Sequence, residues 1–152
     1  MTPHIMTIVL ATDHAGFKHK EALKKYLMEK QYQVKDFGTN SEESCDYPDF
    51  IAQAAKAVSK DPDRTRGIIF GGSGQGEAMV ANRFPHVRAT VYYGGPPEII
   101  ALSREHNNAN MLSIGARFVS VDDMKQLVLR WLSLPDASEE RHLKRIAKID
   151  QL

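Results

Sequence analysis

The sequence predicts an α/β protein in which helices cover both faces of one parallel sheet. Short β-branched, apolar segments alternate with segments of helical periodicity along the whole chain. Glycine-containing turns follow several of the expected strands, as in sheets built from strand–helix–strand units. The length of 152 residues and the 42% hydrophobic content fit a single domain over 1–152, with no repeat or linker.

In the first half of the chain, local signals bound each expected element. The β-branched strand over 5–11 ends at a polar loop, and the helix over 17–30 carries its large apolar side chains on one side. The second strand stops at Gly38, and the next helix tolerates Pro48 in its first turn. The expected order is strand 5–11, helix 17–30, strand 32–37, helix 46–59 and strand 67–70.

The second half continues the alternation. A short helix follows a glycine-rich run, and a Gly-Gly-Pro-Pro loop separates the fourth strand from its helix. Ser120 begins a capping pattern, and Pro135 interrupts the chain before the last helix. The expected elements are helix 77–82, strand 89–93, helix 98–106, strand 111–114, helix 120–132 and helix 137–149.

Composition excludes several classes of function. Twenty Lys and Arg against 19 Asp and Glu leave a net charge of +1, which gives no reason to expect nucleic acid or a membrane surface as partner. The single cysteine, Cys45, excludes an intrachain disulfide and fits a reducing compartment. The six histidines lack metal-ligand spacing, so we expect no metal site. No signal peptide or membrane-length apolar run is present, which favours a cytoplasmic protein.

The run Gly-Gly-Ser-Gly-Gln-Gly-Glu from Gly71 to Glu77 is the most informative feature. It lies where a buried strand is expected to pass into a helix. Glycine permits positive φ angles there, and the exposed N–H groups can hold an anion. Glu77 places a carboxylate at the edge of this loop. Anion-stabilising amides beside a base are what enolate or enediolate chemistry requires.

Three polar loops follow expected strands, at residues 12–16, 71–76 and 115–117. The carboxyl ends of parallel strands meet at one edge of the sheet, where ligands bind. The pattern therefore predicts a small-anion site formed by Asp13, His14, Ser73, Glu77 and Arg117.

Eight short motifs appear in a fixed order along almost the whole chain. They are Asp-His-Ala-Gly-Phe at 13–17, Asp-Phe-Gly-Thr at 36–39, Asp-Tyr-Pro at 46–48, Gly-Ser-Gly-Gln-Gly at 72–76, Ala-Asn-Arg at 81–83, Arg-Glu-His-Asn-Asn at 104–108, Gly-Ala-Arg at 115–117, and Arg-His at 141–142 followed by Arg145. With these motifs the chain resembles the ribose-5-phosphate isomerase B family, which also contains galactose-6-phosphate and allose-6-phosphate isomerases.

The resemblance implies an aldose–ketose isomerase that interconverts ribose 5-phosphate and ribulose 5-phosphate through a cis-enediolate, in the pentose phosphate pathway. It implies a Rossmann-like three-layer domain with a five-stranded parallel sheet and no metal or organic cofactor. It also implies a homodimer or a dimer of dimers, in which the C-terminal helix reaches the neighbouring subunit and the active sites are shared.

One departure assigns the chain to a branch of that family. Many members carry a catalytic cysteine directly before the glycine-rich loop, where this chain has Gly71. Another branch carries a glutamate after the loop, as Glu77 does here, and Cys45 does not align with the catalytic cysteine. The resemblance therefore implies Glu77 as the base and His106 as the ring-opening group. The third catalytic candidate is Ser73, whose hydroxyl could bond the developing oxyanion or relay a proton. Implied substrate contacts are Asp13, His14, Tyr47, Gly72, Gly74, Gln75, Gly76, Asn107, Arg117, Arg141 and Arg145.

Taken alone, the residues leave structural alternatives open. Glu77 is also typical of a first helical turn, Asp13 of a capping position, and His106 of a helix C-terminus. Arg141 and Arg145 are also typical of a solvated basic face, and Tyr47 of a packed aromatic. Two other functions remain open: an isomerase of a six-carbon aldose phosphate, and a non-catalytic module that binds a sugar phosphate or nucleotide.

Overall fold

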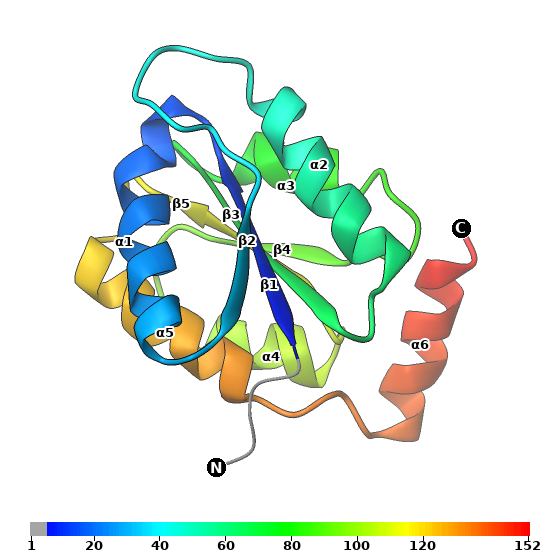
Figure 1. Cartoon of the computed structure of the whole chain (residues 1–152). Helices are drawn as coiled ribbons and strands as arrows, with labels where there is room; N and C mark the ends of the chain where they lie inside the picture. Colours follow the sequence, from blue (N-terminus) through cyan, green and yellow to red (C-terminus); the bar gives the residue numbers. More distant parts are fainter. Residues whose placement is uncertain (1–5) are drawn as a thin grey trace.

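The computed structural model describes residues 6–152 and contains a five-stranded sheet in the order β2-β1-β3-β5-β4 (Figure 1). Every neighbouring pair of strands is parallel, as the alternating sequence pattern predicts. The strands are β1 (Thr7–Thr12), β2 (Gln33–Asp36), β3 (Thr65–Gly71), β4 (Ala89–Tyr92) and β5 (Met111–Gly115). The helices are α1 (Phe17–Glu29), α2 (Tyr47–Lys60), α3 (Gln75–Ala81), α4 (Glu98–Glu105), α5 (Val121–Ser133) and α6 (Glu140–Asp150).

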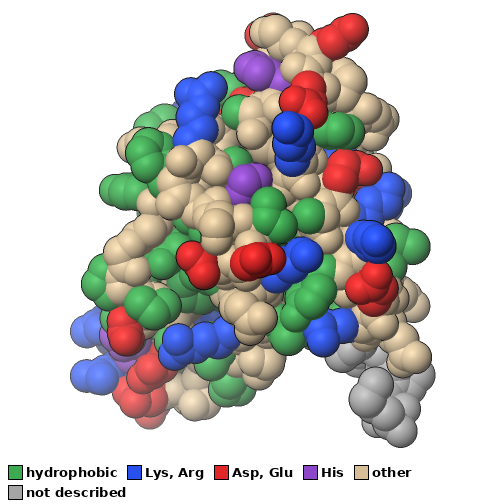
Figure 2. Space-filling model, turned by 90° about the vertical axis from the view of Figure 1, so that its left-hand side faces the viewer, with side chains coloured by type: hydrophobic (Ala, Val, Ile, Leu, Met, Phe, Trp, Pro, Cys, Tyr) green, Lys and Arg blue, Asp and Glu red, His purple; other side chains and the backbone are tan. Residues whose placement is uncertain are grey.

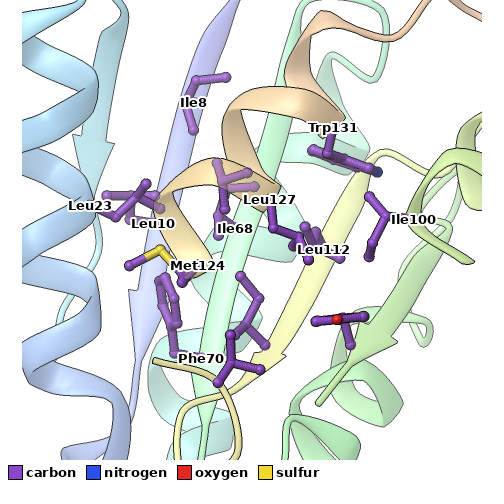
Figure 3. Packing of buried hydrophobic residues seen from close by; sticks show 14 of the residues in the cluster. Ile8, Leu10, Leu23, Ile68, Phe70, Ile100, Leu112, Met124, Leu127 and Trp131 are labelled. Carbon is purple, nitrogen blue, oxygen red and sulfur yellow. The ribbon is translucent and has the colours of Figure 1, made fainter. Parts of the chain in front are cut away.

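Two apolar cores lie on opposite faces of the sheet, which gives the three predicted layers. On one face, α1, α4 and α5 pack against the strands through side chains such as Leu23, Ile100 and Trp131 (Figure 3). On the other face, α2 and α3 pack through Ile51 and Ala81 among others. Burial of both faces explains why the central strands are almost continuously apolar rather than alternating.

The connections define where a ligand site is expected. After β1 the chain moves outward to β2 and then returns to place β3 on the other side of β1. Such a reversal opens a crevice at the carboxyl ends of the two strands. The loops after β1, β3 and β5, which are neighbours in the sheet, therefore meet at one edge, as predicted.

The last helix is fastened near the opposite edge, where the strands begin. In the segment before α6, Asp136 lies 3.1 Å from Arg66 Nη2 in β3 and 2.6 Å from Arg104 Nη2 in α4. At the other end of α6, both carboxylate oxygens of Asp150 accept hydrogen bonds from Arg88, at 2.7 and 2.8 Å. Figure 1 accordingly shows α6 beside the sheet rather than in either covering layer.

Element boundaries differ from the predicted ones at a few places. A short 3-10 helix, η1 (His14–Gly16), occupies part of the expected loop after β1. Helix α3 begins at Gln75 rather than at residue 77, and α6 begins at Glu140 rather than at residue 137. The predicted first strand included Ile5, which lies outside the described residues.

The surface agrees with the balanced composition. Figure 2 shows acidic and basic side chains interspersed over one face of the molecule. Within residues 6–152, no helix is long and apolar enough to cross a membrane.

Candidate active site

The glycine-rich loop is held in place by the end of β5. Gly74 adopts a φ of 81°, a left-handed conformation that glycine tolerates readily, and it caps α3. The Ser113 hydroxyl donates a 2.6 Å hydrogen bond to the Gly74 carbonyl. The amides of Ala116 and Arg117 donate to the carbonyls of Gly71 and Gly72, at 2.8 and 3.1 Å. The loop is therefore fixed before any ligand arrives.

Glu77 is buried at this loop, with 4% of its surface exposed. Its carboxylate occupies the space that a side chain on residue 71 would need, because a Cβ built at Gly71 overlaps the Glu77 carboxyl group. A side chain at position 71 would therefore displace the Glu77 carboxylate from this place. The geometry explains the departure seen in the sequence: a side chain at 71 and this carboxylate exclude each other.

The surroundings of Glu77 favour its neutral form. Burial raises the pKa of this carboxyl group above its ordinary value, and the negative charge of Asp13 raises it further. The N–H groups of Glu77 itself and of Gly74 oppose this shift by bonding to the carboxylate. A carboxylate with a raised pKa is a stronger base than a solvated one, which suits it to remove a proton from carbon.

Two further predicted residues close around the same loop. A Cβ built at Gly76 would lie 2.6 Å from the Tyr47 hydroxyl oxygen, so the phenol reaches the loop beside Glu77. A Cβ built at Gly72 would lie 3.2 Å from Arg117 Cζ, so the guanidinium covers that glycine. Arg117 is exposed and Tyr47 is partly exposed, which leaves both accessible to a ligand.

The loop after β1 contributes Asp13 and His14. Asp13 is buried, and its Oδ1 accepts the amides of Ala15 at 2.8 Å and Gly16 at 3.3 Å, so it does act as a capping aspartate. The Cys45 amide donates to Nδ1 of His14 at 3.3 Å. In the neutral ring this bond leaves Nε2 as an N–H donor. His14 can therefore offer a donor to an anion.

The loop amides are not all free for a ligand. The Gln75 N–H donates to Ser73 Oγ at 3.3 Å, and the Gly74 N–H is directed to the Glu77 carboxylate, whose charged form it stabilises. Of the predicted donors from Ser73 to Gly76, this leaves the amides of Ser73 and Gly76 as candidates for an oxyanion.

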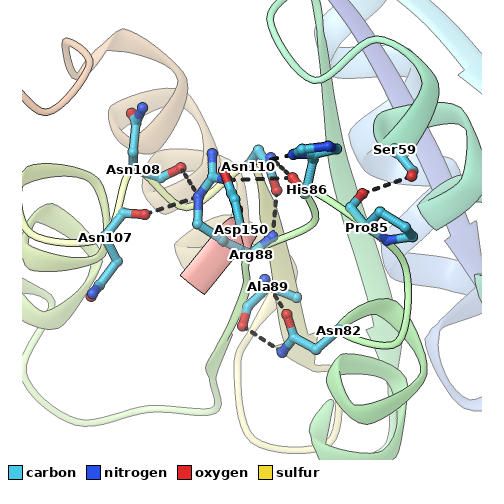
Figure 4. Close-up of polar contacts among 10 residues, drawn as sticks. All are labelled: Ser59, Asn82, Pro85, His86, Arg88, Ala89, Asn107, Asn108, Asn110 and Asp150. Carbon is cyan, nitrogen blue, oxygen red and sulfur yellow. Dashed lines mark hydrogen bonds and ion pairs between the residues drawn. The ribbon is translucent and has the colours of Figure 1, made fainter. Parts of the chain in front are cut away.

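A second group of predicted residues lies at the opposite edge of the sheet. His106 is the C-cap of α4, which returns from the end of β4 toward the start of β5. Arg88, directly before β4, donates to the carbonyls of Asn107 and Asn108 at 3.1 and 3.2 Å (Figure 4). The seven residues of β3 span six steps of about 3.3 Å, so its two ends, and with them the two edges, are about 20 Å apart.

The predicted arginines of α6 belong to this second group. His142, their neighbour on the helix, stacks against His106 with ring centroids 4.4 Å apart. Arg141 is exposed and donates through Nε to Glu139 at 3.0 Å, and Arg145 is exposed one turn further along. Within one chain the predicted site residues therefore form two separate groups, with Glu77 in one and His106 in the other.

Some contributors were missed by sequence reasoning. Ser113 fixes the glycine loop from within β5, and Glu139 pairs with Arg141. The sequence signal that could have identified Ser113 is a small hydroxyl residue inside an otherwise apolar strand. Within the described residues, no group of three or more His, Cys, Asp or Glu side chains could hold a metal ion.

Known proteins resemble this chain over almost its whole length. Residues 8–149 match the family described as Ribose/Galactose Isomerase. Ribose-5-phosphate isomerase B from Mycolicibacterium paratuberculosis is 37% identical over 93% of this chain and 87% of its own length. The Escherichia coli enzyme of the same name is 36% identical over 93% of each chain.

Solved structures show the same fold. Ribose-5-phosphate isomerase B from Clostridium thermocellum superimposes with a TM-score of 0.89 at 38% identity, covering 96% of each chain. The Mycoplasma genitalium protein, solved with bound ribulose-5-phosphate, gives a TM-score of 0.90 at 35% identity over 96% of this chain and 95% of its own. The chain therefore belongs to the ribose/galactose isomerase family.

Proposed function

We propose that this protein is an aldose–ketose isomerase that interconverts D-ribose 5-phosphate and D-ribulose 5-phosphate. The observation that carries the proposal is the buried Glu77 carboxylate, seated where a side chain at residue 71 would otherwise lie. A buried base beside loop amides fits proton transfer at carbon, and it has no purpose in a module that only binds. The relatives named as ribose-5-phosphate isomerase B support the choice of substrate.

In the proposed reaction, His106 first opens the furanose by giving a proton to the ring oxygen and taking one from the O1 hydroxyl. Glu77 then removes the C2 proton, and the electron pair moves to O1 to form the cis-enediolate. The amides of Ser73 and Gly76 stabilise the developing charge, and the loss of one such donor typically costs about 3 kcal/mol. The Ser73 hydroxyl relays a proton from O2 to O1, and Glu77 returns its proton to C1.

We propose that the site is completed by a second copy of the chain. His106 and Glu77 cannot meet within one subunit, because they lie at opposite edges of the sheet. A two-fold dimer would bring the Glu77 group of one subunit against the partner subunit's His106, and would do so twice. Asn107 would then hold a sugar hydroxyl from the same side as His106.

Phosphate binding would draw on both subunits. His14 and Arg117 would contribute from the Glu77 side, and Arg141 and Arg145 from the partner subunit's α6. The two α6 arginines are four residues apart and share a helix face. Charge-assisted bonds from guanidinium groups are among the strongest that a phosphate can receive. The remaining predicted contacts, Asp13, Tyr47, Gly72, Gly74 and Gln75, would line the sugar. The expectation of a cytoplasmic location stays a prediction.

A substrate panel tests the proposal directly. Purified protein in buffer with a metal chelator is assayed with ribose 5-phosphate, allose 6-phosphate and galactose 6-phosphate, and the ketose products are measured. We expect the five-carbon substrate to have the highest kcat/KM. A higher kcat/KM on a six-carbon substrate would show that ribose 5-phosphate is not the preferred substrate. Absence of turnover on all three sugar phosphates would contradict the proposal that the protein is an isomerase.

A further inference from the structure

The His106 ring is in contact with a second histidine ring. It lies against the ring of His142 from α6, with centroids 4.4 Å apart and an interplanar angle of 25°. The His106 side chain is 41% exposed, whereas His142 is buried with 4% of its surface accessible. A buried ring therefore covers one face of a ring that is open to a ligand.

No hydrogen bond among the described residues accounts for the burial of the His142 side chain. Its Nε2 is buried and, within residues 6–152, lacks a hydrogen-bond partner. The nearest acidic group is Glu139, whose Oε2 lies 3.6 Å from Nε2 and also accepts the 3.0 Å hydrogen bond from Arg141. A purely apolar side chain would fill this space without leaving a buried nitrogen unpaired.

The helix that carries His142 is fixed independently of the rings. Ile146, one turn later, is also buried, and Asp150 at the end of α6 pairs with Arg88. Arg88 in turn holds the backbone of Asn107 and Asn108, directly after His106 (Figure 4). One connected set of hydrogen bonds and buried contacts thus holds the segments that carry the two histidines and sets how the rings lie against each other.

We infer that His142 is a positioning residue that fixes the plane of the His106 ring for opening the sugar. The second side-chain torsion of histidine is broad, so an exposed imidazole without a neighbour samples many orientations. Stacking against the buried ring opposes rotation about the Cβ–Cγ bond of His106 and so restricts the plane of its ring. Proton transfer to a ring oxygen depends on such alignment. The inference rests on the proposed function, because it assumes that His106 opens the furanose.

If His142 positions the His106 ring, its loss should impair only substrates that must be opened, whereas a general structural role would impair all substrates alike. Only a substrate that arrives as a closed ring needs His106. Ribose 5-phosphate closes through its 4-hydroxyl, so the 4-deoxy aldopentose 5-phosphate stays open while it keeps C1, C2 and the phosphate. The defect of a His142 variant should therefore depend on whether the substrate is cyclic.

The test compares His142→Ala and His142→Phe with the wild type on both substrates. His142→Ala should lose about tenfold or more in kcat/KM on ribose 5-phosphate, a part of the roughly 10²–10⁴-fold that a positioned acid–base group contributes. The same variant should process the 4-deoxy substrate at the wild-type rate. His142→Phe keeps a flat ring against His106 and should keep the wild-type rate on both.

Ile146→Ala provides the matched control, because it shortens another buried side chain of α6. It should change the two rates by the same factor. The inference would be overturned if His142→Ala lost the same factor on both substrates or lost nothing on ribose 5-phosphate. It would also be overturned if His142→Phe lost as much kcat/KM on ribose 5-phosphate as His142→Ala. Failure of the proposed function would look different, since the wild-type protein would then convert neither substrate.

Discussion

The contact between Gly71 and Glu77 allows the placement of the base to be tested without altering the base itself. Gly71→Ala adds one methyl group at the place that the Glu77 carboxyl group occupies. The backbone at residue 71 is an ordinary strand conformation, so alanine brings no conformational strain of its own. The carboxylate must therefore leave its buried position, or β3 and α3 must separate.

The expected magnitudes follow from this geometry. Inserting a methyl group into a packed interior costs about 1–3 kcal/mol of stability. Losing an aligned general base costs about 10²–10⁴-fold in rate. We expect Gly71→Ala to remain folded, with a lowered melting temperature, and to lose kcat on ribose 5-phosphate by a factor in that range.

Gly67→Ala is the matched control on the same strand. Its added Cβ would lie 2.6 Å from Met111 Cε, at the flexible end of a side chain that can move aside. This variant should lose stability while it retains kcat. Measurement of kcat and thermal unfolding for both variants decides the matter. A Gly71→Ala enzyme with the wild-type kcat, or equal kcat losses in the two variants, would refute the placement of the base.

Three further predictions concern the same site. Burial raises the pKa of Glu77, and only its carboxylate form accepts a proton, so kcat/KM should fall as the pH drops through a value above the ordinary 4.5. After correction for ionisation of the substrate phosphate, an acidic limb at or below 4.5 would contradict this. Cys45→Ser should keep near wild-type kcat, because Gly71 stands where the family's catalytic cysteine would act and Cys45 contacts His14 through its backbone amide; a loss of about 10²-fold or more in a folded variant would assign the thiol a role in the chemistry. Inactive Glu77→Gln and inactive Arg141→Ala/Arg145→Ala subunits should regain activity when refolded as mixed dimers, since one site of each mixed dimer then carries neither lesion. Mixed dimers that form, as shown by mass spectrometry, but stay inactive would refute a shared site.

Most of the fold could be predicted from the sequence, because its signals are local. Every expected helix and strand is present, and the parallel order follows from strand–helix alternation. The boundary errors have specific causes. Helix α3 starts early because Gly74 caps it in a left-handed conformation, and α6 starts late because Asp136 ties the preceding residues to Arg66 and Arg104.

The candidate site could be predicted only in part. The glycine-rich loop and Glu77 are adjacent in sequence, so the sequence predicts that they lie close together, whereas the exclusion between Glu77 and a side chain at 71 depends on how β3 and α3 pack in three dimensions. The residue roles themselves stay predictions. The stacking of His106 on His142 joins residues from two helices far apart in the chain, and no local pattern indicates it.

The kinetics of Glu77→Gln test the central claim most directly. Glutamine nearly preserves the shape of the side chain but cannot accept the C2 proton, so the loss belongs to the transition state rather than to substrate binding. Turnover is measured at saturating ribose 5-phosphate, and binding of the substrate is measured separately by calorimetry. We predict that the variant binds the sugar phosphate with nearly wild-type affinity and loses most of kcat. Turnover within a few-fold of the wild type would show that Glu77 is not the base.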